Sequence, residues 1–67
     1  MNEIIFLVEE SAEGGYEARA LGVSIFSDGD SLDELKKNVR EAVQCHFEKD
    51  APSVIRLHYV KEEVIAA

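Results

Sequence analysis

The sequence predicts an α+β domain with two layers, in which one helix packs on one face of an antiparallel sheet. Short stretches rich in Ile, Val, Phe and Tyr lie on both sides of one segment whose apolar residues have helical spacing. Glycine-containing turns separate these stretches, which is typical of strands. The predicted element order is β-β-β-α-β, and residues 1–67 are expected to form a single domain.

Three strands are predicted before the helix. The first covers Glu3–Glu10, and a turn over residues 11–15 follows it, where two glycines permit the positive φ angles of a hairpin. Alternation over Tyr16–Leu21 predicts a half-buried second strand. After a bend at a further glycine, a short third strand is predicted over Val23–Ser27.

The helix has the clearest local signal in the sequence. Residues 28–30 are expected to end the third strand, and Ser31 with Glu34 matches the capping box that opens a helix. Apolar residues then form one stripe, made of Leu32, Leu35, Val39, Ala42, Val43 and Phe47. Residues 49–53 end the helix, and a last strand is predicted from Val54 to about Glu63.

The first strand is apolar on both of its faces. Because one helix covers only one face of a sheet, the other face would expose apolar side chains unless a second chain covers it. Small domains also gain stability from association, since their own cores are limited. We therefore expect a homodimer, a higher homo-oligomer or a hetero-complex. The residues expected on this second face are Ile5, Leu7, Arg56, His58 and Val60.

The chain is strongly acidic, with 14 Asp and Glu against 7 Lys and Arg and a formal net charge of −7. Such a surface repels phosphates, so we expect no direct binding to nucleic acid. A small basic protein is the natural electrostatic complement, although the charge would also serve solubility alone. The acidic side chains expected to contact such a partner are Glu9, Glu10, Glu13 and Glu17.

No set of residues predicts catalysis, a metal site or a cofactor. Cys45 and His46 are neighbours on the predicted helix and point about 100° apart, so they do not form a nucleophile–base pair. His46 is expected to be partly buried in the core, and Cys45 half-buried at its edge. Zinc needs three or four converging ligands, and no motif with such spacing is present. A single cysteine and the lack of a signal or membrane-spanning segment predict a cytoplasmic protein without membrane contact.

Part of the chain resembles the amino-terminal domain of HicB-family antitoxins. The resemblance is carried by Gly15-Tyr16-Glu17-Ala18, Gly22, the run from Ser27 to Leu35, Asn38 and Glu41-Ala42. It implies a partial RNase H-like fold without the catalytic carboxylates, which binds and blocks a small basic RNA-cleaving toxin of the HicA type. The sequence departs from the family in having Ala20-Leu21-Gly22-Val23 where a proline-rich segment is usual.

Two hypotheses for function remain, one implied by the resemblance and one by the uncovered second face of the sheet. The first is a non-catalytic binding module that neutralises a small basic RNase by occluding it. The second is a self-assembling structural or regulatory domain with no toxin partner. Full antitoxins usually add a DNA-binding segment after this domain; this chain ends at Ala67, so repression of an operon by it is not expected.

Overall fold

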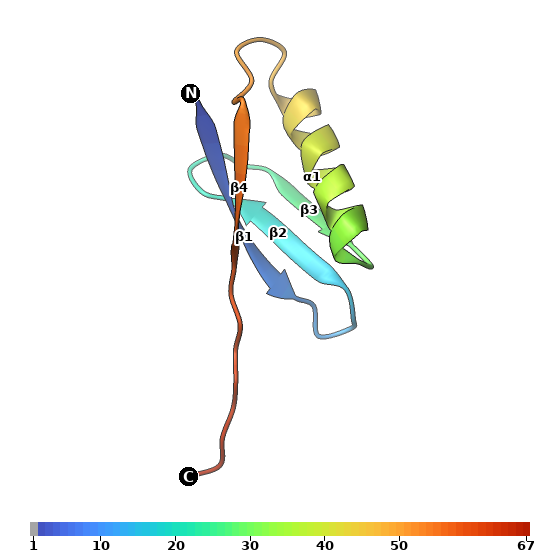
Figure 1. The fold of residues 1–67 in the computed structure, drawn as a ribbon, viewed down its shortest axis with the longest axis vertical. Helices are drawn as coiled ribbons and strands as arrows, with labels where there is room; N and C mark the ends of the chain where they lie inside the picture. Colours follow the sequence, from blue (N-terminus) through green and yellow to red (C-terminus); the bar gives the residue numbers. More distant parts are fainter. Residues whose placement is uncertain (1) are drawn as a thin grey trace.

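In the computed structural model, which describes residues 2–67, a four-stranded sheet carries one helix on one face (Figure 1). The elements in chain order are β1 Glu3–Glu10, β2 Tyr16–Ala20, β3 Phe26–Gly29, α1 Leu32–His46 and β4 Val54–Tyr59. The structure confirms the α+β class and the order β-β-β-α-β. In space, the strands lie in the order β3-β2-β1-β4.

The sheet is mixed, whereas the sequence led us to expect antiparallel pairing throughout. β1 pairs with β2 and β2 with β3 in antiparallel fashion, but β4 lies parallel to β1. The reason is the connection. Two antiparallel steps make β3 run in the direction of β1, and α1 returns the chain so that β4 starts from the same end.

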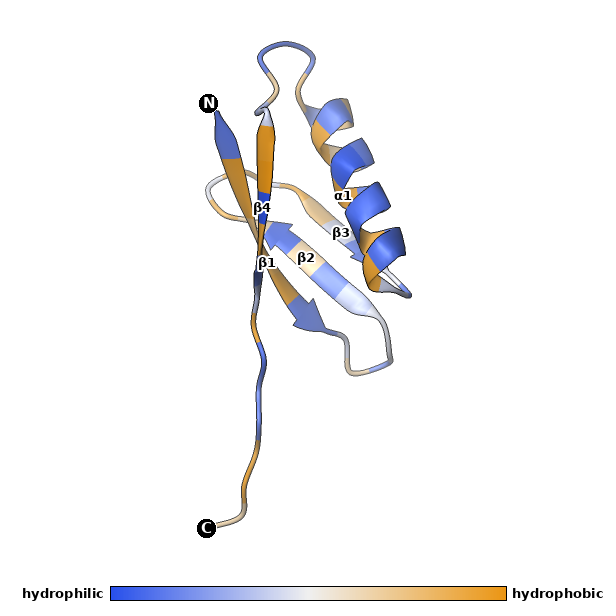
Figure 2. Ribbon diagram, in the orientation of Figure 1, coloured by the Kyte–Doolittle hydropathy of each residue, from blue (hydrophilic) through white to orange (hydrophobic). Residues whose placement is uncertain are grey.

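The core lies between α1 and one face of the sheet. Alternate residues of β1, Ile4, Phe6 and Val8, are at most 2% exposed, and Ala18 of β2 lies beside them. The helix contributes its predicted stripe to this core, as Figure 2 shows by the apolar side that α1 turns to the sheet. The buried residues of that stripe are Leu35, Val39 and Val43, with Leu32, Ala42 and Phe47 partly buried around them.

The start of α1 is held closely against β3. The Glu34 N–H donates to the Ser31 side-chain oxygen at 3.1 Å, which confirms the predicted cap. Asn38 donates from its side chain to the Asp28 carbonyl at 2.8 Å. Gly29 is buried beneath the helix start, where a Cβ atom would lie 2.5 Å from the Leu35 nitrogen. Only glycine fits so close an approach of strand and helix.

The bounds of three strands differ from the prediction, and the smallest difference is in β2, which ends at Ala20 rather than Leu21. β3 begins at Phe26 rather than Val23 and includes Asp28 and Gly29, which had been expected to end it. The apolar residues before it belong instead to the bend, in which the Ile25 N–H bonds to the Val23 carbonyl at 2.9 Å. The last strand ends at Tyr59, four residues before the predicted end.

Two further expectations about α1 were wrong. Cys45 and His46 are both exposed, although His46 had been expected partly in the core. The helix ends at His46 and the chain turns away there, so the ring contacts Phe47 edge to face, 4.9 Å between centroids, rather than the core. Among residues 2–67, no helix has the length and apolar character needed to cross a membrane.

Candidate protein-binding surface

The sheet face opposite α1, here called the open face, has no helix covering it (Figure 1). The strand register places Ile5 beside Arg56 and Leu7 beside His58 on this face. Ile5 and Leu7 are half-buried, and Arg56 and His58 are exposed. The structure therefore brings together four of the residues that the sequence assigned to the second face. Val60 follows by alternation and is 45% exposed.

Three carboxylates form one row across the open face, here called the acid row. Glu9 of β1 pairs with Glu17 of β2, and Glu17 pairs with Asp28 of β3. Side chains paired in this way have Cβ atoms about 4.5–5.5 Å apart, and like charges directly opposite destabilise a sheet. All three are exposed. Within residues 2–67 the only ion pair joins Arg56 to Glu3, so no carboxylate of the acid row is in an ion pair.

The acid row continues into a hollow at the β2–β3 end of the sheet. The hollow has a volume of about 480 Å³. Its acidic lining residues are Glu13, Glu17, Asp28, Asp30 and Glu34, and no Lys or Arg lines it. Tyr16 and Phe26 add aromatic surface. Since Asp30 and Glu34 flank the start of α1, the positive end of the helix dipole offsets part of this negative charge.

A second row on the open face combines apolar side chains with Arg19 and lies directly beside the acid row. Leu7 pairs with Arg19, and Arg19 pairs with Phe26. Phe26 is 60% exposed, and Leu21 at the end of β2 is 46% exposed. An apolar surface next to a cluster of carboxylates suits a partner that offers aliphatic or aromatic groups beside basic ones.

The structure divides the acidic residues that the sequence had grouped. Glu9 and Glu17 share the acid row, and Glu13 lies at its end in the hairpin turn. Glu10 pairs with Tyr16, so it belongs to the opposite face at the end of β1. The contributions of these residues to binding stay predictions.

Sequence reasoning missed three acidic residues of this surface, Asp28, Asp30 and Glu34. It had used them only for their roles in a turn and a helix cap. They lie close to Glu17 because β3 includes Asp28 and because the register of β3 against β2 pairs Asp28 with Glu17. A signal was present in the sequence, because four of the seven residues from 28 to 34 are acidic and Glu17 lies in the strand predicted to come before them.

The surface does not have the geometry of a metal site. Within residues 2–67, no three His, Cys, Asp or Glu side chains converge as ligands for a metal ion. The acid row runs across three strands rather than around one point. Its chemistry is therefore that of an extended anionic surface, which attracts a cationic macromolecule over an area.

Comparison with known proteins found two similar proteins, both described as UPF0150 proteins. One, from Thermotoga maritima, is 41% identical over 64 residues, which cover 96% of this chain and 91% of that protein. The other, from Archaeoglobus fulgidus, is 61% identical over 46 residues, which cover 69% of this chain and 68% of that protein. No family model matches the chain. No solved structure matches it either.

Proposed function

The chain belongs to the UPF0150 family, and we propose that it is a non-catalytic binding module whose open sheet face holds a small basic protein. The acid row supports this proposal most directly. Glu9, Glu17 and Asp28 stand directly opposite one another without an ion pair. This arrangement lowers the stability of the free domain, and a basic partner would relieve the repulsion.

The partner we propose is an RNA-cleaving toxin of the HicA type, as the resemblance to HicB-family domains implies. The motif residues Gly15, Gly29 and Asn38 pack the hairpin, β3 and α1 together, and those elements carry the acidic hollow. The resemblance and the acidic surface thus concern the same part of the molecule. RNases need basic residues to bind phosphates, so an acidic surface placed over them would block RNA by occlusion.

The experiment that tests this proposal captures a partner of the protein and measures how its affinity depends on salt. The protein is used as bait at low salt in an extract of its native organism, and any small basic protein retained is purified and assayed for RNA cleavage. We expect cleavage that the chain inhibits, and an affinity that falls as salt is raised, because exposed charges are screened. Recovery of no such protein by folded bait, or an affinity independent of salt, would contradict the proposal.

A matched pair of variants assigns the binding to the acid row. Glu9→Gln with Glu17→Gln and Asp28→Asn should weaken the complex roughly tenfold or more, because basic groups of the partner lose their complement. The control changes the net charge equally at exposed positions away from the row: Glu41→Gln, Glu48→Gln and Asp50→Asn. Equal losses in both triple variants would mean that net charge alone, and not this surface, drives binding.

A further inference from the structure

The chain continues beyond β4 as an extended segment, residues 61–67, here called the tail. Figure 1 shows it running straight on from β4 and away from the sheet. Val64 and Ile65 within it are 86% and 82% exposed, the highest values among the large apolar residues described. Two adjacent aliphatic side chains that stay in solvent do not stabilise the single chain. Contact with a second molecule that removes their apolar surface from water would favour association.

β4 also has a free edge. It is the last strand in the sheet order β3-β2-β1-β4. The Val54 and Val60 N–H groups bond toward β1, at 3.2 Å to the Asn2 carbonyl and 2.8 Å to the Val8 carbonyl. Because backbone groups alternate in direction along a strand, every second residue between Val54 and Val60 directs its N–H and C=O groups away from β1. The outward-pointing groups belong to Ile55, Leu57 and Tyr59, and such an edge is a template for another strand.

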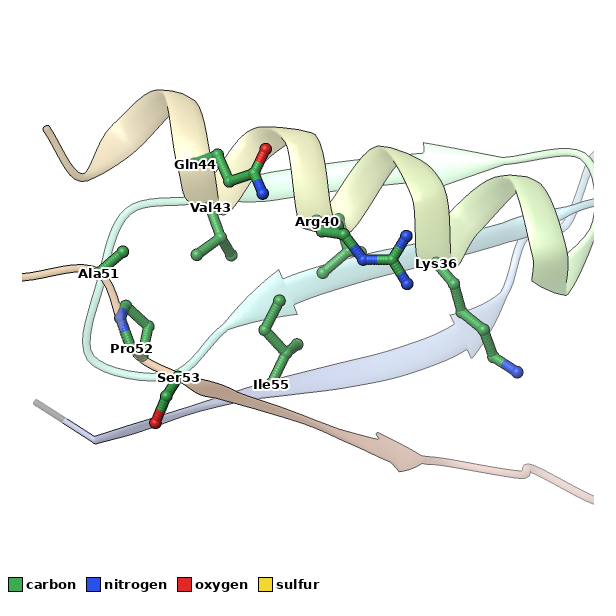
Figure 3. A pocket seen from close by; sticks show the side chains of 9 residues that line it. Lys36, Arg40, Val43, Gln44, Ala51, Pro52, Ser53 and Ile55 are labelled. Atoms are coloured by element: carbon green, nitrogen blue, oxygen red, sulfur yellow. The ribbon is translucent and has the colours of Figure 1, made fainter.

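A groove between α1 and β4 lies beside this edge, because α1 packs mainly on β3 and β2. Its volume is about 530 Å³. Figure 3 shows Ile55 rising from β4 into the space and Lys36 and Arg40 reaching into it from the helix. The groove thus has a basic rim and an apolar floor. The floor residues are Val39, Val43, Pro52 and Ile55.

We propose that two copies of this chain pair through their β4 strands, antiparallel and centred on Val60, so that the tail of each lies in the groove of the other. Antiparallel neighbours related by a two-fold axis perpendicular to the sheet keep both helices on one side. The two sheets become one, and each tail becomes a strand beside the other copy's β4. This is strand addition of a kind common in peptide recognition.

The alternation of side chains selects this centre. Ile55 and Leu57 lie on the α1 side of β4, since they pair with Ile4 and Phe6. Continuing the alternation places Lys61, Glu63 and Ile65 on that same side. Centred on Val60, the pairing sets Ile65 opposite Ile55, inside the groove. It sets Glu63 opposite Leu57, on the side of the sheet where Lys36 and Arg40 supply the positive charge of the rim.

A centre one residue earlier fits the charges less well. If Tyr59 were at the centre, Glu63 would lie opposite Ile55 and Lys61 opposite Leu57, so that charges would face the apolar floor. Centring on Val60 also places Glu62 opposite His58 on the open face, where the carboxylate can accept a hydrogen bond from an imidazole N–H. Val60 then meets itself across the axis, at a non-hydrogen-bonded pair where side chains are closest.

A second copy is a better occupant of the groove than the chain's own tail. The tail leaves β4 at the end opposite to residues 51–53, which form one end of the groove (Figure 1). Pairing of β4 edges also differs from the open-face packing expected from sequence. A symmetric packing of open faces would bury acid rows against each other, whereas the edge pairing leaves β2 and β3, with Glu17 and Asp28, outside the interface.

The first test is the mass of the particle in solution, measured by light scattering over a dilution series. We expect twice the 7.5 kDa of the chain. Val64→Asp with Ile65→Asp should raise the dissociation constant of the dimer at least tenfold. Because both side chains lie outside the core, far-UV circular dichroism should show an unchanged fold. The control is Phe26→Asp, which replaces another exposed apolar side chain, on the open face, and which should leave the dimer intact.

The second test determines the register in which the two β4 strands pair. In a Cys45→Ser background, Val60→Cys should form a disulfide-linked dimer under mild oxidation, because this residue meets its own copy. Ala12→Cys in the hairpin turn, exposed and remote from the axis, should stay monomeric on a non-reducing gel. A monomeric parent protein, an intact dimer in the tail variant, a dimer lost only with Phe26→Asp, or no Val60→Cys crosslink would overturn the proposal. None of these results depends on the toxin hypothesis.

Discussion

The two faces of the sheet are made by alternate residues of the same strands, yet they differ in nearly every physical respect. In β1, Phe6 is fully buried against α1, whereas its neighbour Leu7 is half-buried on the open face. No polar or charged residue of the described chain is buried in the core. The open face instead aligns Glu9, Glu17 and Asp28 in one row.

We infer from this difference that stability depends on the covered face and the proposed binding on the open face. The covered face has the composition that folding alone would favour, with aliphatic and aromatic side chains closely packed. The open face accepts like charges side by side, which costs free energy in the isolated domain. An arrangement that opposes stability without a structural need is typical of functional surfaces. The following changes test this separation, from the largest expected effect to the smallest.

Truncation of the covered face should have the largest effect. Phe6→Ala removes a side chain with 0% exposure, and such changes cost about 3–5 kcal/mol of unfolding free energy. In a domain of this size that is most of the total. The measurement is urea denaturation followed by circular dichroism. Phe26→Ala on the open face, at 60% exposure, should cost less than about 1 kcal/mol. Similar losses of unfolding free energy in the two variants would contradict the proposed difference between the faces.

A methyl group added beneath α1 should have the next largest effect. Gly29→Ala places a Cβ atom 2.5 Å from the Leu35 nitrogen, so the helix start must move, at a cost of about 1–3 kcal/mol. The matched control is Ser27→Ala, on the same side of the same strand, which should change stability by less than about 1 kcal/mol. Thermal unfolding compares the two. An unchanged midpoint for Gly29→Ala would mean that α1 is held less closely than the structure indicates.

Neutralising the acid row should have a smaller effect, and of the opposite sign. Glu9→Gln with Glu17→Gln and Asp28→Asn removes two directly opposed like-charge pairs, and we expect a gain of roughly 0.5–1 kcal/mol at low salt. The gain should shrink at high salt because of screening. Denaturant titrations at two ionic strengths measure it. A loss of stability would show that these carboxylates stabilise the fold, which would undermine the functional interpretation.

The exposed ion pair should have the smallest effect. Arg56 and Glu3 remain 55% and 37% exposed in their side chains, and pairs of this kind contribute about 0–1 kcal/mol. Glu3→Gln should therefore lower the unfolding free energy by less than about 0.5 kcal/mol. A larger loss would mean that the open face contributes to stability through its charges as well.

The predictable part of the fold is the part determined by local pattern. The first strand, Glu3–Glu10, was predicted with the bounds observed, because its apolar run is bounded by acids and a glycine turn. The stripe and cap of α1 were predicted for the same reason. The direction of β4 was not, because it depends on where the chain crosses over and not on the residues of the strand itself.

The candidate surface was predictable only in part. Strand alternation was sufficient to place Ile5, Leu7, Arg56 and His58 together. Predicting the acid row requires knowing that Glu17 pairs with Asp28. The third strand was predicted to end at Ser27, so this pairing could not be recognised. Val23 and Ile25 have the residue types of a strand, yet they form the bend, since the backbone of Gly22 turns through a positive φ of 79°. Local strand propensity therefore predicted the third strand too early in the chain, because pairing with the neighbouring strand determines which residues form it.

Two glycines hold the acidic hollow in a fixed shape. A Cβ atom on Gly15 would lie 2.7 Å from the Gly29 carbonyl oxygen, and Gly29 in turn lies directly under the start of α1. The hairpin, β3 and the helix start thus approach one another closely through their backbones, which leaves little room for one to shift without the others. A surface preorganised in this way loses little conformational entropy when a partner docks. Its association rate would then be set by electrostatic attraction and diffusion rather than by a conformational step.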